Sequence, residues 1–120
     1  MKTGRQTMLR SMLCGAALLA GALLAGAPAF AEDGATVTLT VKDHRFSPAE
    51  PHAAANKPFS IVVKNLDPTP IEFESKTLRV EKVIAGGAEA SIRMRALAPG
   101  KYKFFDEYNE KTAQGVLIVE

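Results

Sequence analysis

Polar and apolar residues alternate strictly over residues 36–42, which read TVTLTVK. In an extended chain this alternation places Val37, Leu39 and Val41 on one face and the threonines on the other. The same period of two returns at residues 59–64 and 89–97, whereas helical periodicity is hard to find. A period of two is typical of strands with one buried face, so the pattern predicts an all-β domain.

Frequent turn signals separate these alternating segments and keep each of them short. The clearest signals are Asn56-Lys57-Pro58, Asn65 to Pro70 with two prolines, Gly86-Gly87 and Pro99-Gly100. Counting the segments between turns predicts seven or eight strands, which is the pattern of an antiparallel β-sandwich. Alternation also predicts the core residues Phe59, Phe73, Met94, Tyr102 and Phe104.

The first 31 residues differ from the rest of the chain in composition. A basic start that includes Lys2, Arg5 and Arg10 precedes an apolar run over residues 12–27, and small residues follow at 29–31. This layout predicts a secretory signal peptide over residues 1–31, cleaved after position 31, and a mature domain over residues 32–120. The apolar run is shorter than the roughly 20 residues that span a bilayer, which argues against a membrane anchor.

Removing the predicted signal changes both the charge and the cysteine content. Three of the fifteen basic residues and no acidic ones leave with it, so twelve positive charges face thirteen negative ones. A net charge of −1 gives no reason to expect nucleic acid or an anionic membrane as partner. The only cysteine, Cys14, also leaves, so the mature domain is expected to use neither a disulfide nor a thiolate.

Enzyme chemistry finds little support in the mature segment. It has no cysteine nucleophile, its serines lie in no nucleophile-elbow context, and no glycine-rich loop opens a helix. We therefore expect no catalytic activity from the side chains, and a binding or interaction role instead.

The loops at one end of the predicted sandwich gather most of the chemically interesting residues. If consecutive strands run alternately up and down, residues 43–49, 65–70, 85–88 and 106–115 share one pole. These loops and the strand start that follows carry His44, Asp67, Glu72, Asp106, Glu107 and Asn109. One imidazole and several carboxylates are thus expected to converge there.

Each candidate also has a purely structural interpretation. Glu72 and Glu74 share one strand face, which suits a hard cation but equally suits a solvated sheet face. His44 is either a ligand or a polar residue of a solvated turn. Asp106 is either a ligand or an ordinary turn former at a strand end.

Residues 42–48, 65–75, 99–102 and 115–119, in this order and spacing, resemble the cupredoxin-like fold. The closer resemblance is to exported cupredoxin-like domains of the EfeO type, which are associated with iron uptake, through residues 72–75, 81–84 and 104–106. The resemblance implies a Greek-key β-sandwich in the periplasm. It also implies a link with copper or iron handling beside an inner-membrane iron permease.

The chain departs from these families at several ligand positions. The position of the copper thiolate falls near Asp106 and that of the following histidine near Asn109, so the resemblance implies no blue-copper centre. The iron-uptake relatives often carry histidines where this chain has Asn109 and near Lys76.

Two functions remain open on sequence grounds. The first is a periplasmic protein that binds copper or iron through His44, Glu72, Glu74 and Asp106 in support of metal transport. The second is a metal-free interaction module that presents its acidic pole to a membrane permease.

Overall fold

The computed structural model describes residues 35–120, so the predicted signal peptide and its cleavage site lie outside the described residues. The strands are β1 (Ala35–Lys42), β2 (Arg45–Ser47), β3 (His52–Ala53), β4 (Phe59–Asn65), β5 (Ile71–Ser75), β6 (Val80–Ile84), β7 (Glu89–Met94), β8 (Gly100–Asp106) and β9 (Gln114–Val119). One short 3-10 helix, η1 (Glu107–Asn109), follows β8. Within residues 35–120, no helix is long and apolar enough to cross a membrane.

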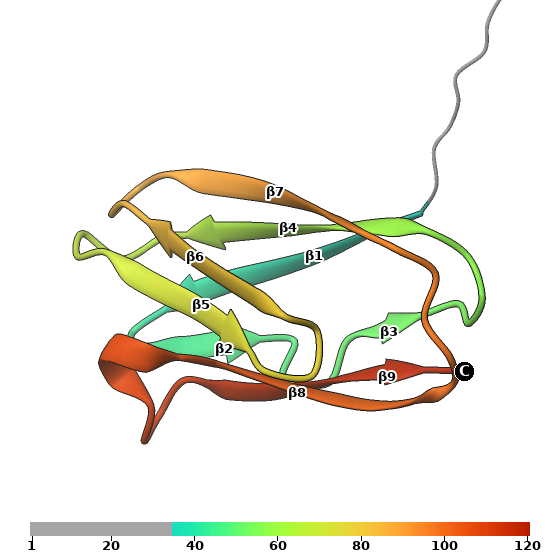
Figure 1. Cartoon of the computed structure of the whole chain (residues 1–120). Coiled ribbons are helices and arrows are strands. Elements are labelled where there is room, and N and C mark those ends of the chain that lie inside the picture. The colour runs from blue at the N-terminus through green and yellow to red at the C-terminus, as the bar shows by residue number, and fades with distance from the viewer. Residues whose placement is uncertain (1–34) are drawn as a thin grey trace, which may run out of the picture. The chain divides into compact units, whose positions relative to one another are not determined.

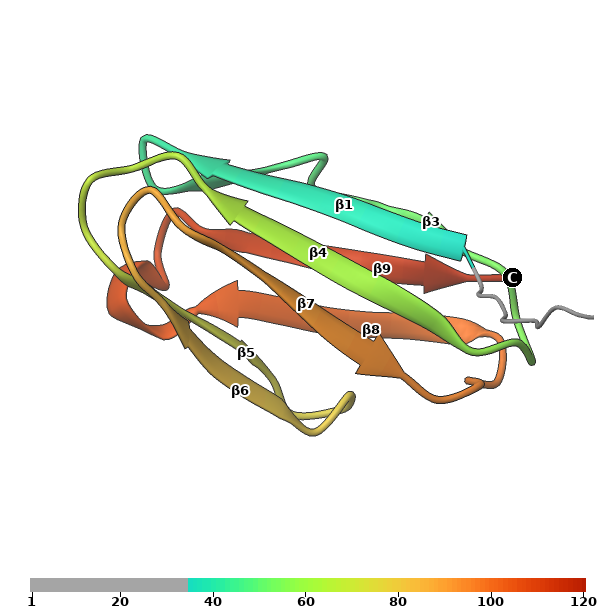
Figure 2. The ribbon, with the colours of Figure 1, turned by 90° about the horizontal axis from the view of Figure 1, so that it is seen from above.

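The strands form two sheets that pack face to face, as Figures 1 and 2 show. One sheet has the order β2-β1-β4-β7 and the other the order β3-β9-β8-β5-β6. The predicted all-β sandwich is confirmed, with nine strands in place of seven or eight. β2 was not predicted, because residues 43–49 were assigned to a loop.

Both sheets are mixed, although the sequence suggested antiparallel pairing. β1 runs parallel to β4 and β3 parallel to β9, while the other strand pairs are antiparallel. A parallel pair requires a crossover between its strands, and the chain between β1 and β4 makes one through β2 and β3. Alternation within a single strand cannot reveal such pairing.

The core follows the predicted alternation. Val37, Leu39 and Val41 of β1 are buried, and so are the predicted core residues Phe59, Phe73, Met94 and Phe104. Three phenylalanine rings join the sheets: Phe46 of β2 meets Phe104 edge-on at 5.0 Å and Phe73 at 5.9 Å between centroids. Tyr102 is only half-buried, and its hydroxyl donates a hydrogen bond to the Ala98 carbonyl at 2.7 Å.

The loops at the left of Figure 1 meet as predicted and are tied together by buried polar groups. The Asn65 amide donates to the carbonyl oxygens of Thr69, Ile84 and Ala85 at 2.8–3.2 Å. A Cβ on Gly86 would collide with the Pro68 carbonyl, so only glycine allows this close approach. These bonds hold the loop before β5 and the end of β6 against the end of β4.

Candidate metal site

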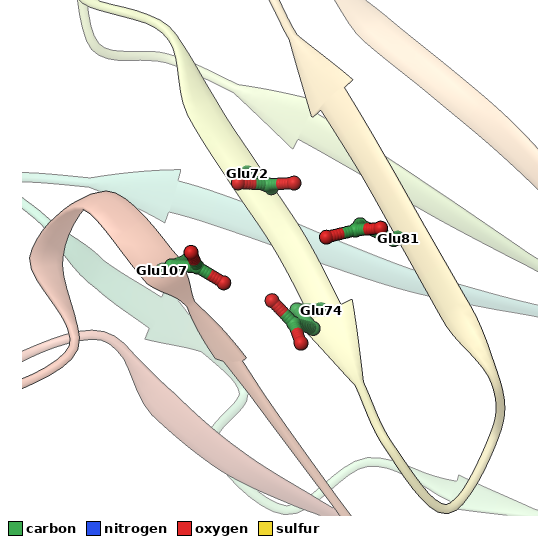
Figure 3. A group of neighbouring side chains, drawn as sticks. All are labelled: Glu72, Glu74, Glu81 and Glu107. Carbon is green, nitrogen blue, oxygen red and sulfur yellow. The ribbon is translucent and has the colours of Figure 1, made fainter.

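Four glutamates converge on the outer face of the larger sheet, as Figure 3 shows. They come from β5, from β6 and from the first residue of η1, and we call them the glutamate cluster: Glu72, Glu74, Glu81 and Glu107. Each offers one carboxylate oxygen, and these oxygens lie within 4.8 Å of one another. Among the described residues this is the group of acidic side chains that could hold a cation.

Strand alternation places two of these side chains outside. Ile71 and Phe73 are fully buried, so Glu72 and Glu74 between them point away from the core. The antiparallel register of β5 and β6 then sets Glu81 directly opposite Glu74. Like charges in directly opposed positions are destabilising, and a proton or a cation between the two carboxylates would relieve this repulsion.

Glu74 carries the unusual electrostatics of the cluster. Its Oε1 atom is buried and has no hydrogen-bond partner among the described residues. A hydrogen bond with Glu107, followed by burial and by the charges of Glu107, Glu81 and Glu72, raises the pKa of Glu74 to about 7. Burial first, and then the charge of Glu107, also raises the pKa of Glu72. The raised pKa values indicate that the negative charges of the cluster repel one another and are not neutralised by nearby positive charges.

Asp106 lies beside the cluster but is fully committed to other bonds. It is completely buried, and its Oδ1 accepts the backbone N–H groups of Glu72 at 2.9 Å and Tyr108 at 3.0 Å. Its Oδ2 accepts the side-chain amide of Asn109 at 2.9 Å. Asp106 therefore caps η1 and holds the start of β5 to the end of β8. Through these bonds it positions Glu72 and Glu107.

His44 lies in a separate corner of the same pole. Its Nδ1 is 3.6 Å from Oδ2 of Asp67, and its side chain is 46% exposed. Asp67 accepts the backbone N–H groups of Asp43 at 2.7 Å and His44 at 2.9 Å, which holds both residues at positive φ. The bond from His44, more than any other cause, lowers the pKa of Asp67.

Of the sequence candidates, the structure thus brings together Glu72 and Glu74, and it places His44 and Asp106 outside the group of converging oxygens. Sequence reasoning did not select Glu81 and Glu107 as ligands. Glu107 was already among the residues of the shared pole. Glu81 could have been found only from the register of the hairpin that joins β5 to β6.

Comparisons with known proteins agree with this architecture. A family model described as "Cupredoxin-like domain" matches residues 15–119. An uncharacterized protein of Rickettsia prowazekii (strain Madrid E) is 36% identical over 83 residues, which cover 69% of this chain and 66% of that protein. The chain therefore spans just under two thirds of this relative's length.

Two solved structures illustrate the likeness of fold. The Cu(I)-bound metal binding domain of the Cu(I)-exporting P-type ATPase CopA from Streptococcus pneumoniae D39 is 19% identical, with a TM-score of 0.64 over 77% of this chain and 92% of that one. Auracyanin A, a "blue" copper protein from Chloroflexus aurantiacus, is 14% identical, with a TM-score of 0.61 over 72% of this chain and all of that one. At these identities the likeness concerns the fold alone.

Proposed function

This chain belongs to the cupredoxin-like domain family, and we propose that it handles metal by binding a hard cation, iron in particular, through the carboxylates of the glutamate cluster. One observation carries the proposal: the buried Oε1 of Glu74 lacks a partner, while the carboxylates of three other glutamates lie close to that of Glu74. A buried polar atom without a partner costs free energy, and a cation among the carboxylates would remove that cost.

The residues present do not fit a blue-copper centre. Such a centre requires a cysteine thiolate, and the only cysteine of the chain is Cys14, in the predicted signal peptide. Asp106 stands near the expected thiolate position, and three hydrogen bonds already occupy its carboxylate. Cu(I) prefers sulfur ligands, which the glutamate cluster lacks.

The donor set of the glutamate cluster suits a hard cation instead. Carboxylate oxygens are preferred by hard ions, and Fe(III) is the hardest of the ions that the family resemblance suggests. Cu(II) is the competing ion, since the Irving–Williams order favours it at most nitrogen and oxygen sites. A coordinating carboxylate must be deprotonated, and the pKa of Glu74 is raised to about 7, so binding near or below neutral pH would release a proton.

The biological setting that we propose follows from the sequence. The predicted signal over residues 1–31 supports export to the periplasm, and the resemblance to EfeO-type domains supports delivery of iron to an inner-membrane permease. We propose binding rather than catalysis, because the mature segment offers no nucleophile in a catalytic context.

Calorimetry on the exported protein tests the proposal. We expect one equivalent of Fe(III), supplied as its nitrilotriacetate complex, to bind at neutral pH, and Glu74→Gln to weaken binding by at least about tenfold. Glu89→Gln, which changes an exposed carboxylate of β7, is the control and should bind as the wild type does. Absence of binding with both Fe(III) and Cu(II) would favour the metal-free interaction module instead.

A further inference from the structure

A cleft of about 440 Å³ separates two edge strands on one side of the sandwich. β6 ends one sheet and β7 ends the other, and Figure 2 shows both strands on this side. Residues 78–82 and 92–95 line the cleft. Apart from Glu81, it shares no residue with the glutamate cluster.

The floor of the cleft is apolar and incompletely covered. Val80 pairs with Ser75, Ile92 with Ile61 and Met94 with Phe59, and these three partners are buried. Because cross-strand partners share a face, Val80, Ile92 and Met94 face inward. Met94 is buried, but Val80 and Ile92 are only half-buried. The floor therefore offers apolar surface that another chain could cover.

The walls of the cleft are strongly basic. Four exposed cations line it, Arg79, Lys82, Arg93 and Arg95, against the single carboxylate of Glu81. Within residues 35–120, none of the four cations forms an ion pair with a carboxylate. The cleft therefore offers uncompensated positive charge above an apolar floor.

Both edges of the cleft also offer unpaired backbone groups. Among the described strands, β6 pairs only with β5, and β7 pairs only with β4. Lys82 is on the inward face of β6, opposite the buried Phe73, and an inward charge at an edge normally prevents apolar strands from pairing there. A strand that carries carboxylates would meet no such obstacle.

We propose that this cleft binds an extended acidic segment of a partner protein, which adds as a strand to one of the two edges. Main-chain hydrogen bonds to the edge would supply affinity, and alternate side chains would supply specificity. Carboxylates of the segment would face Arg79, Lys82, Arg93 and Arg95, while its apolar residues cover Val80 and Ile92. This partner site shares only Glu81 with the glutamate cluster.

A substitution at Arg79 can distinguish a role in binding the segment from a role in stabilising the fold. Its φ is 60°, in the left-handed region that favours glycine and asparagine. Arg79→Asn should therefore leave the protein as stable as the wild type or more stable, because asparagine tolerates this conformation better. The same substitution should weaken binding of the acidic segment, whereas an arginine of purely structural value would show no such loss.

The probe is an acetylated, fluorescein-labelled peptide of alternating Glu and Val, and the readout is fluorescence anisotropy with the exported protein. We expect saturable binding that weakens with added salt. The double variant Arg93→Gln, Arg95→Gln should bind about fivefold more weakly, given the modest strength of exposed ion pairs. Arg45→Gln on β2 is the control and should not change binding. Equal binding of a Lys-Val peptide would overturn the proposal.

Backbone methylation tests whether the segment adds as a strand. A strand that pairs along one edge directs every second N–H at the protein, so methylating one alternate set should abolish binding and methylating the other should preserve it. Two methylated peptides that bind alike would contradict strand addition. Sedimentation velocity tests whether a second copy of this chain occupies the cleft instead. A wild-type dimer that is lost in the Arg93→Gln, Arg95→Gln variant would mean that the cleft binds a second copy and not a partner segment.

Discussion

Two groups of carboxylates in the sandwich differ in how far hydrogen bonds from the protein satisfy them. Asp67 and Asp106 are buried, and each accepts hydrogen bonds from backbone N–H groups. The glutamate cluster lies on the outer face, and Glu74 has a buried oxygen without a partner. Accordingly the pKa of Asp67 is lowered and that of Glu74 is raised to about 7. Carboxylates with full hydrogen bonding hold the fold together, and those without it indicate where a cation would be stabilised.

The largest effect on stability is expected at Asp106. Asp106→Ala leaves two backbone N–H groups and the Asn109 amide without their acceptor, so the free energy of unfolding should fall by about 3 kcal/mol. Urea denaturation measures this loss. A loss well below about 1 kcal/mol would mean that these bonds contribute little to stability. It would contradict the conclusion that the fully hydrogen-bonded carboxylates stabilise the fold.

Metal should stabilise the protein through the glutamate cluster alone. At a free Fe(III) concentration of a hundred times Kd, the free energy of unfolding should rise by about 2.7 kcal/mol. Thermal unfolding with and without Fe(III) measures the effect, and Glu74→Gln should lose most of it at the same metal concentration. An equal gain in Glu74→Gln would place the metal elsewhere.

The pH dependence of stability should have opposite signs at Glu74 and at Asp67. The pKa of Glu74 is raised from 4.5 to about 7 in the folded protein, so the folded form binds more protons between these values. Its contribution to stability is complete below about pH 4.5 and is lost as the pH rises through about 7. The lowered pKa of Asp67 contributes above its ordinary value of 3.8 and is lost in acid below it.

Melting temperatures across this pH range measure both effects in the metal-free protein. In Glu74→Gln, the melting temperature should fall less as the pH rises toward neutral. In Asp67→Asn, the melting temperature should fall less as the pH is lowered into the acid range. A fall toward neutral pH that is unchanged in Glu74→Gln would contradict the raised pKa.

The smallest effect is expected at His44, although it was a ligand candidate on sequence grounds. Asp67 binds the backbone of His44, and the exposed imidazole adds only a partner at 3.6 Å. His44→Ala should therefore change the free energy of unfolding by less than about 1 kcal/mol, as exposed ion pairs do. Calorimetry should find its Fe(III) affinity unchanged. A tenfold loss of affinity would return His44 to the ligand set.

The sequence alone predicts most of the fold but only half of the glutamate cluster. Alternation places Glu72 and Glu74 outside, because each strand's own pattern fixes its faces. The same period, counted from Phe104, would have placed Asp106 on the inner face, where the structure has it. Glu81 depends on how β6 registers against β5, and Glu107 depends on the turn into η1. The alternation of residues within one strand carries no information about strand register or about the course of a turn.

The position of β9 has a consequence for how the chain reaches its folded state. β9 lies between β3 and β8, so this sheet remains in two parts until β9 is inserted. Its assembly depends on contacts between residues far apart in the sequence, and such topologies fold slowly and cooperatively. The five-stranded sheet therefore closes only after β9, the last of the described strands, has been made and has paired with both neighbours.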